Sequence, residues 1–215
     1  MEKTFRGRPE ETDRQQEQGA AGTPDDLVSR AALFAAEAHR GVKRKQGQPY
    51  ILHPMEVAVI ISTMTDDPHV IAAGLLHDVV EDTPHTAEEI REQFGDRVAA
   101  LVAAETENKR ANLPPEQTWK IRKEESLEEL RATEDDAVRI LWLADKLSNI
   151  RSLRRMLQAE GEKTWTHFHM QDIAEQAWYY RTIAEALSQL RDTDAWQEYV
   201  QLVGEVFGEA DGETK

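Results

Sequence analysis

Hydrophobic positions along this chain recur with the period of an α-helix. Between residues 27 and 39 they lie three or four residues apart, from Leu27 through Phe34 to Ala38, which predicts a helix with one buried face. Thr23 and Pro24 precede this segment as an N-cap residue and a proline at the first helical position. The same period predicts further helices over residues 54–64, 68–76, 86–95, 98–105, 119–130, 138–157, 170–190 and 194–207.

Prolines and capping residues predict several of the helix ends. Pro54 and Pro68 each open a helix, Thr86 and Glu89 have the spacing of a capping box, and Gly95 ends the helix that follows them. Residues 57–61 have the composition of a short strand, but the flanking proline and the length of the apolar pattern favour a helix. The sequence contains no convincing strand pair, glycine-rich phosphate loop or internal repeat, so the predicted fold class is all-α.

Length and polarity predict one folded domain. The chain has 215 residues, which is enough for one helical domain with a full core but too few for two comfortable ones. Residues 1–22 are polar and aperiodic, so we expect a disordered arm there, a domain over 23–207 and a flexible tail over 208–215. No apolar stretch approaches the ~20 residues of a membrane span, and the N-terminus lacks the apolar core of a signal peptide. A cytoplasmic protein is the simplest expectation.

The charge balance excludes one class of partner and leaves another open. There are 26 Lys and Arg residues against 41 Asp and Glu, a formal net charge of −15. Such a surface repels a polyanion, so we expect no extended nucleic-acid partner. Cations gather in one place, where Arg40, Lys43, Arg44 and Lys45 fall within six residues with no acid among them. This basic run is either a solvated loop or a local site for a small anion.

Ionisable side chains follow the most apolar segment of the chain. Residues 70–76 are nearly all apolar, and His77, Asp78, Glu81 and Asp82 come directly after them. Residues four apart share one helix face, so His77 is predicted to lie over Glu81 and Asp78 over Asp82. Burying such groups without compensation costs several kcal/mol each. A divalent cation would supply that compensation.

Two further residues have the chemistry of metal ligands. His53 lies between an apolar run and Pro54, and Asp145 interrupts an otherwise apolar helix face. Taken singly, a histidine such as His53 is more often a hydrogen-bonded structural residue than a ligand, and Asp145 could pair with Lys146 or Arg151. The chain has no cysteine, so any metal must be bound by His, Asp or Glu. That ligand set favours Mn²⁺ or Mg²⁺ over a structural zinc.

The order of these residues resembles that of a known family. His53, then His77-Asp78, then Asp145 is similar to the H…HD…D signature of the HD phosphohydrolase superfamily. A more specific resemblance, to the RelA/SpoT hydrolase domain, rests on four blocks between residues 27 and 157: RKQGQPYILHP at 44–54, LHDVVEDT at 76–83, FG at 94–95 and LADKLSN at 143–149. No synthetase-domain sequence follows, so the closest resemblance is to a stand-alone small alarmone hydrolase, which removes the 3′-pyrophosphate of ppGpp or pppGpp.

The resemblance implies an HD-type helical domain with a metal site in the core of the helix bundle. It also implies roles in metal binding and water activation. One Mn²⁺ would be held by a set of four residues: His53, His77, Asp78 and Asp145. Glu81 and Asp82 would position and deprotonate the attacking water. These roles agree with the residue types, because a metal ion polarises phosphate and acidifies water while a neighbouring carboxylate takes the proton.

The resemblance also implies contacts to a guanine nucleotide. Arg44 would meet the base, Lys45 and Lys109 the phosphates, and Asn149 the ribose. A planar guanidinium is suited to stacking on a purine. One departure stands directly before the LADKLSN block, where the family usually has lysine and this chain has Trp142. That change would either alter substrate contacts or repack a surface.

Two alternatives remain at this stage. The first is an HD phosphohydrolase for another nucleotide, such as the 2′-phosphate of NADPH or a nucleoside monophosphate, because selectivity depends on pocket shape. The second is a non-catalytic nucleotide sensor. The presence of Glu81 and Asp82 argues against the sensor, because binding alone does not require a pair that activates water. The sequence does not indicate an oligomeric state.

Overall fold

The protein is described by a computed structural model that covers residues 24–107, 110 and 112–208. The predicted arm over 1–22, the N-cap Thr23 and the tail beyond residue 208 lie outside the described residues. The described chain forms helices in this order: α1 (Pro24–Ala38), α2 (Leu52–Ser62), α3 (Pro68–Leu76), α4 (Val79–Asp82), α5 (Ala87–Phe94), α6 (Asp96–Ala103), α7 (Pro115–Ala132), α8 (Asp136–Glu160), the 3₁₀ helix η1 (Gly161–His167), α9 (Ile173–Ala186), the 3₁₀ helix η2 (Ser188–Leu190) and α10 (Asp194–Phe207). Within these residues the only β-type pairing is an isolated bridge between Lys43 and Pro49, which confirms the all-α prediction.

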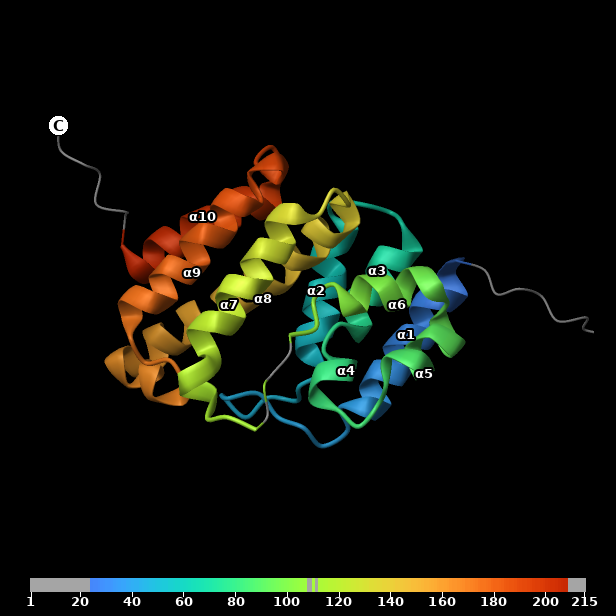
Figure 1. Ribbon diagram of the computed structural model, residues 1–215, viewed down its shortest axis with the longest axis horizontal. Coiled ribbons are helices and arrows are strands. Elements are labelled where there is room, and N and C mark those ends of the chain that lie inside the picture. The colour runs from blue at the N-terminus through green and yellow to red at the C-terminus, as the bar shows by residue number, and fades with distance from the viewer. Residues whose placement is uncertain (1–23, 108–109, 111, 209–215) are drawn as a thin grey trace, which may run out of the picture.

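The longest helix, α8, lies at the centre of the molecule (Figure 1). It packs against α2 and α3 on one side and against α10 and η1 on the other. The first group is completed by α1 packed on α3 and by α5 packed on α6, and the second by α7 and α10, which both pack on α9. Because α8 faces both groups, its apolar side chains are almost fully buried, and Leu141, Leu143, Ala144, Leu147 and Ile150 are at most 1% exposed.

Several helix ends fall where the sequence predicts them. Pro68 opens α3, and the side chain of Asp67 caps it by accepting from the amide of His69. The Thr86–Glu89 capping box opens α5, and Gly95, with φ +87°, ends that helix. The left-handed φ explains why glycine stands at this position.

The helix predicted to carry His77 through Asp82 is interrupted, and this part of the prediction is wrong. Helix α3 ends at Leu76, His77 is its C-cap residue, and Asp78 precedes the short helix α4. The ring Nδ1 of His77 lies 2.9 Å from the carbonyl oxygen of Gly74. The imidazole thereby satisfies one of the last carbonyls, which a helix end leaves without a backbone partner.

Other helix bounds differ by a few residues. Helix α2 begins at Leu52, so Pro54 occupies its first turn instead of opening it. The C-terminal segment predicted over 170–190 is shorter, because Asp172 caps α9 by accepting from the amides of Ala174 and Glu175. The preceding 3₁₀ helix, η1, begins at Gly161, whose φ of +60° ends α8.

The contact between α2 and α3 depends on a missing side chain. Gly74 lies where a Cβ atom would run into the Cδ1 atom of Ile61 and approach the Cγ1 atom of Val57 to 3.3 Å. The two helices therefore come closer than any larger residue would allow. This close approach brings the end of α3, with His77, next to the start of α2, with His53.

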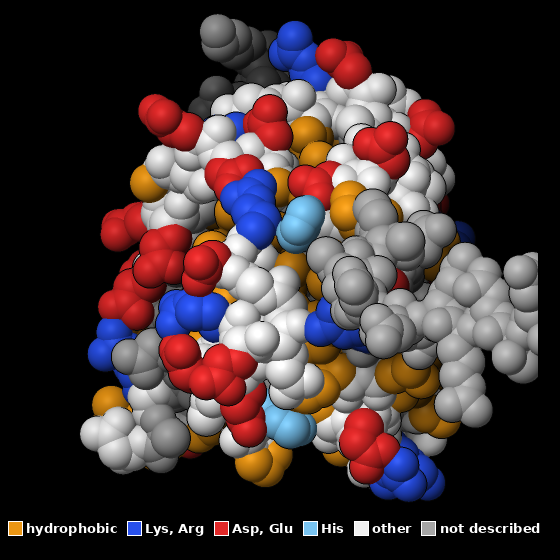
Figure 2. All heavy atoms as spheres, turned by 90° about the vertical axis from the view of Figure 1, so that its right-hand side faces the viewer, with side chains coloured by type: hydrophobic (Ala, Val, Ile, Leu, Met, Phe, Trp, Pro, Cys, Tyr) orange, Lys and Arg blue, Asp and Glu red, His pale blue; other side chains and the backbone are white. Residues whose placement is uncertain are grey.

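Acidic side chains are spread over the face of the molecule shown in Figure 2, where the described Lys and Arg residues intermingle with them and form no continuous basic patch. Among the described residues, no helix is both long and apolar enough to span a bilayer.

Candidate metal centre and substrate pocket

Three predicted metal ligands converge where α2, α3 and α4 meet. His53, His77 and Asp78 each offer a ligand atom, and these atoms lie within 4.8 Å of one another. His53 and His77 are 4% and 3% exposed, and their rings meet edge to face with centroids 5.1 Å apart. The Oδ2 atom of Asp78 lies 3.0 Å from Nε2 of His77 and 3.5 Å from Nε2 of His53.

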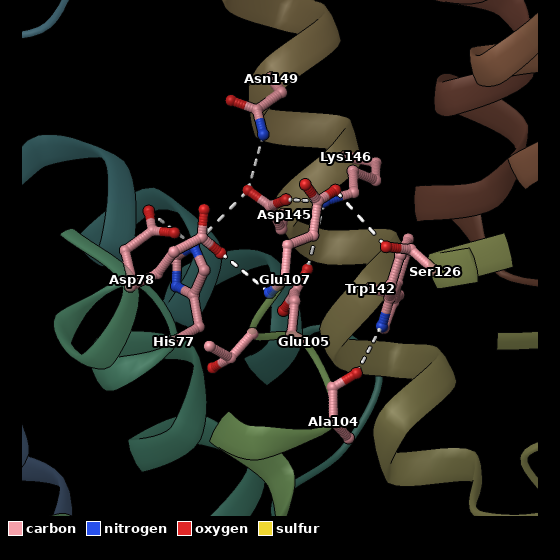
Figure 3. Close-up of polar contacts among 12 residues, drawn as sticks. His77, Asp78, Ala104, Glu105, Glu107, Ser126, Trp142, Asp145, Lys146 and Asn149 are labelled. Atoms are coloured by element: carbon pink, nitrogen blue, oxygen red, sulfur yellow. Dashed lines mark hydrogen bonds and ion pairs between the residues drawn. The ribbon is translucent and has the colours of Figure 1, made fainter. Parts of the chain in front are cut away.

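The fourth predicted ligand, Asp145, comes from α8 and lies beside the other three. Its Oδ1 is 2.9 Å from Nε2 of His53 and 3.6 Å from Nε2 of His77. Asp145 also accepts from Nζ of Lys146 at 2.5 Å and from Nδ2 of Asn149 at 2.7 Å. The ion pair with Lys146 (Figure 3), which the sequence offered as an alternative to metal binding, is therefore present together with the approach to both histidines.

The arrangement of donor atoms fits a divalent cation. A carbonyl oxygen only accepts hydrogen bonds, so the Gly74 carbonyl requires the ring proton of His77 to be on Nδ1. Its Nε2 is buried and makes no hydrogen bond of normal geometry with any residue that the structure describes. The nitrogen–oxygen separations of 2.9–3.6 Å across the cluster are close to the roughly 3 Å expected between neighbouring ligands about 2.1 Å from one ion.

The electrostatics of the cluster favour positive charge. Burial opposes charge on His77, but the carboxylates of Asp78 and Asp145 outweigh it and raise the pKa of this imidazole well above its ordinary value. Burial would raise the pKa of Asp145, yet Lys146 and then the two histidines hold it well below its usual range. Burial dominates for His53 and lowers its pKa. A neutral His53 beside ionised carboxylates is the state that a metal ligand requires.

The two predicted water-activating residues flank the cluster and are held by different groups. The Oε2 atom of Glu81 accepts from the backbone N–H of Glu107 at 3.2 Å. Asp82 is more exposed, and its Oδ2 lies 3.0 Å from the hydroxyl of Tyr50. That hydroxyl is also 2.6 Å from Oδ2 of Asp78, so Tyr50 bridges a predicted metal ligand and a predicted catalytic residue.

A buried ionic network supports the far side of the site. Lys146 joins Asp145 to Glu105, whose Oε1 lies 3.4 Å from Nζ. Glu107 accepts from Lys123 and, at 2.5 Å, from Arg122. These contacts fix the segment after α6 between α7 and α8, and with it the amide that meets Glu81.

Trp142 is part of the same support. It is 2% exposed, its Nε1–H donates to the carbonyl of Ala104 at 3.3 Å, and Nζ of Lys146 lies 4.6 Å from its ring centroid. The indole also lines the pocket described below. Of the two possibilities raised by the sequence, repacking of a surface is wrong, because the side chain is buried.

A pocket of about 510 Å³ opens over the metal cluster and is lined by three further predicted site residues: Arg44, Lys45 and Asn149. Arg44 donates to Oδ1 of Asn149 at 3.0 Å and lies 5.8 Å from the centre of the Tyr50 ring. Nζ of Lys45 is 3.4 Å from the ring centroid of Phe168, and although the residue is partly exposed, burial of its head group and then the charge of Arg44 lower its pKa to about 8.

The basic run is thus divided between solvent and pocket. Lys43, Arg44 and Lys45 line the pocket, whereas Arg40 is exposed and pairs with Glu37. The turn that presents them is closed by backbone bonds from Arg44 N–H to Gln48 O and from Gly47 N–H to Arg44 O. Lys109, the other predicted phosphate contact, lies outside the described residues.

Sequence reasoning missed several residues of this site. Three residues that line the pocket are not among the predicted site residues: Tyr50, Lys146 and Phe168. The LADKLSN block did contain a signal for Lys146, since a lysine next to a buried Asp145 is a candidate to neutralise it. No comparable signal exists for Phe168, which lies in the irregular segment after η1.

Comparison with known proteins agrees with this geometry. Residues 31–172 match the HD domain family. A guanosine-3′,5′-bis(diphosphate) 3′-pyrophosphohydrolase of Aquifex aeolicus is 43% identical over 126 residues, which are 59% of this chain and 18% of that protein. The chain therefore spans about a fifth of the length of this curated relative.

Two solved structures align with a larger share of this chain. The crystal structure of lmo0812 from Listeria monocytogenes superposes with a TM-score of 0.63 and 36% identity, over 72% of this chain and 98% of that one. A metazoan ortholog of SpoT, which hydrolyzes ppGpp and plays a role in starvation responses, gives a TM-score of 0.66 and 25% identity, over 86% of this chain and 97% of that one.

Proposed function

Because the chain belongs to the HD domain family, we propose that it is a metal-dependent phosphohydrolase that converts ppGpp and pppGpp to GDP and GTP with release of pyrophosphate. The names of the Aquifex relative and of the metazoan structure support this substrate class. The observation that carries the proposal is the convergence of two imidazole nitrogens and two carboxylates at the wall of a pocket that also holds Arg44 and Lys45.

The metal would be held by a set of four residues: His53, His77, Asp78 and Asp145. A mixture of imidazole and carboxylate ligands, without thiolate, supports Mn²⁺ as the ion. When bound, such an ion stabilises negative charge on phosphate oxygen and makes a water molecule more acidic. Lys146 keeps Asp145 ionised for this role, because its ammonium group is within 2.5 Å of the carboxylate.

Glu81 acts as the general base in this proposal. It takes a proton from the attacking water while the water oxygen bonds to the phosphorus next to ribose O3′; the P–O3′ bond breaks and O3′ takes up a proton. The amide of Glu107 orients the carboxylate of Glu81. Asp82, oriented by the hydroxyl of Tyr50, positions the water.

The nucleotide lies along the pocket. Arg44, held in place by Asn149, presents its guanidinium plane to the purine, and Asn149 lies near the ribose. Lys45 neutralises phosphate charge, which is favourable because its ammonium group is already partly removed from water beside Phe168. A lysine in such a position gains more from an anion than a fully solvated one does.

A substrate panel tests the proposal directly. Chelator-stripped protein reconstituted with Mn²⁺ is given ppGpp, pppGpp, NADPH and GMP, and pyrophosphate and phosphate are measured separately. We expect pyrophosphate from the first two substrates only and no turnover in the stripped protein. Full activity without metal would refute the mechanism, phosphate release from NADPH or GMP would assign another substrate, and binding of ppGpp without turnover would indicate a sensor.

Two variants separate metal binding from water activation. Glu81→Gln keeps shape and hydrogen-bonding capacity but removes the base, so it should retain metal, bind ppGpp and lose about 10² to 10⁴ in kcat. His77→Ala removes a ligand, so metal content and activity should fall together. Elemental analysis, calorimetric titration with ppGpp and rate measurement distinguish these outcomes. Parental turnover in Glu81→Gln would exclude Glu81 as the base, and a full complement of metal in His77→Ala would exclude His77 as a ligand.

A further inference from the structure

A chain of hydrogen bonds runs from His53 to the C-terminal helix α10. It passes from His53 to Ser148 and Glu56, and from there through Arg151 to Glu198. We propose that Ser148 and Glu56 are positioning residues, which hold His53 in the tautomer whose Nε2 is free to bind metal and connect this ligand to α10. The inference rests on the proposed role of His53 as a metal ligand.

Ser148 is the central residue of this chain of hydrogen bonds. It is fully buried on α8, with 0% exposure, one helical turn after Asp145. Its Oγ lies 2.8 Å from Nδ1 of His53 and 2.9 Å from Oε2 of Glu56. Glu56 lies on α2, three residues after His53, so one buried hydroxyl joins two residues of the neighbouring helix.

The direction of each hydrogen bond follows from the charge on Glu56. Nη1 of Arg151 donates to Oε1 of Glu56 at 3.1 Å, and a carboxylate paired in this way only accepts hydrogen bonds. The Ser148 hydroxyl must therefore donate its single proton to Glu56. Its oxygen is left to accept, so the ring proton of His53 must be on Nδ1. Nε2 then faces Oδ1 of Asp145, 2.9 Å away. Without a cation between them this carboxylate favours a proton on Nε2, so Ser148 and Glu56 act against it.

Arg151 connects this arrangement to the C-terminal helix. Its Nε and Nη2 atoms donate to the two carboxylate oxygens of Glu198 on α10, at 2.7 and 2.6 Å. Two parallel bonds to one carboxylate fix the plane of the guanidinium group, and with it the Nη1 that meets Glu56. Because α8 lies between α2 and α10 (Figure 1), this chain of hydrogen bonds crosses the centre of the molecule.

The two histidines of the site thus depend on different kinds of support. The tautomer of His77 is fixed by the backbone carbonyl of Gly74, three residues away. That of His53 is fixed by Ser148, 95 residues away, and therefore depends on how α2 and α8 pack. Loss of such an outer-shell partner typically lowers metal affinity about 10- to 100-fold, and we expect that range for Ser148→Ala.

The tautomer can be measured without metal or activity. Long-range ¹H–¹⁵N correlation spectra of the full chain, recorded with chelator at about pH 8, above the ordinary imidazole pKa, distinguish a protonated Nδ1 from a protonated Nε2. We expect His53 to be protonated mainly on Nδ1 in the parent and to shift toward Nε2–H in Ser148→Ala, where the Asp145 carboxylate is left as the acceptor beside the ring. Glu56→Gln should shift the balance toward Nε2–H, because an amide N–H can donate to Ser148 and release the hydroxyl proton toward His53.

Metal affinity provides the second readout, with Mn²⁺ as the probe. Ser148→Ala and Glu56→Gln should both weaken Mn²⁺ binding, with the His77 resonances unchanged. Thr182→Val is the control for losing a buried hydroxyl, since Thr182 bonds only to the Trp178 carbonyl of its own helix. It should leave both the tautomer and the affinity as in the parent.

The outcomes separate this inference from the proposed function. If His53→Ala binds Mn²⁺ as tightly as the parent, His53 is not a ligand, and the proposed metal site fails with the inference. If His53→Ala loses affinity but Ser148→Ala keeps the Nδ1–H tautomer and parental affinity, the metal site stands and the positioning role of Ser148 is refuted. Parental behaviour in Glu56→Gln alone would refute the role of Glu56.

Discussion

Glu105 is expected to make this protein less stable as the pH rises. Its side chain is buried, Oε1 lies 3.4 Å from Nζ of Lys146, and Oε2 is buried with no hydrogen-bond partner among the described residues. Lys146 is closer to Asp145, at 2.5 Å, so one ammonium group serves two buried carboxyls and favours Asp145. Burial, opposed by Lys146 and reinforced by Asp145, raises the pKa of Glu105 from its ordinary 4.5 to about 7.

The sign and size of the effect follow from this pKa. Because the folded-state pKa lies above the unfolded value, the folded protein binds more protons between pH 4.5 and about 7, so stability falls as the pH rises through that window. A tenfold change in proton affinity corresponds to about 1.4 kcal/mol of free energy. The raised pKa of Glu105 therefore lowers the free energy of unfolding by about 3 kcal/mol at pH values above this window and has no effect below it. Glu105→Gln cannot ionise, yet keeps the shape and an acceptor for Lys146.

The assay is urea denaturation of parent and Glu105→Gln at about pH 5 and about pH 8.5, with chelator present and ionic strength constant. We expect the variant to be more stable by about 1–3 kcal/mol at the higher pH and to lose that advantage at the lower one. Glu128→Gln, at an exposed position on α7, is the control and should stay within about 0.5 kcal/mol of the parent. A stability difference for Glu105→Gln that is independent of pH would refute the reasoning.

Two further predictions concern the core around the site. Lys146→Met leaves two buried carboxyls without their cation and should cost about 3–5 kcal/mol in the same urea assay at about pH 8.5; a loss below about 1 kcal/mol would show that water or another cation replaces it. Gly204→Ala on α10, where a Cβ meets nothing within 4 Å, should gain about 0.5–1 kcal/mol from helix propensity. Gly74→Ala has the same gain in helix propensity, but its new Cβ runs into Ile61. Its thermal and urea stability should therefore lie about 1–3 kcal/mol below that of Gly204→Ala. Equal gains in the two variants would contradict the close approach of α2 and α3.

The helices could be predicted from the sequence because their apolar faces repeat regularly and their caps are local. Pro68, Gly95 and the Thr86–Glu89 box each act within one turn of helix, and each has the predicted effect. The break at His77 could not be predicted in this way. At the break a ring nitrogen bonds a backbone carbonyl, and the helical spacing of His77, Asp78, Glu81 and Asp82 gives no sign of it.

The predicted ligands and the residues that hold them differ in how visible they are in the sequence. His53, His77 and Asp145 stand out because an ionisable group inside an apolar pattern needs an explanation. Ser148 and Glu56 are ordinary polar residues on helices, where polar residues are expected, and nothing in their spacing links α2 to α8.

Trp142 shows a further limit, because the sequence predicts only an altered substrate contact or a repacked surface at this position. Its indole packs in the core, and its N–H fixes the Ala104 carbonyl, in the segment whose Glu107 amide meets Glu81. Sequence pattern therefore identifies groups that are costly to bury, because the cost is a property of the residue itself. The orientation of those groups depends on partners such as Ser148, 95 residues from His53, whose contribution exists only once the helices have packed.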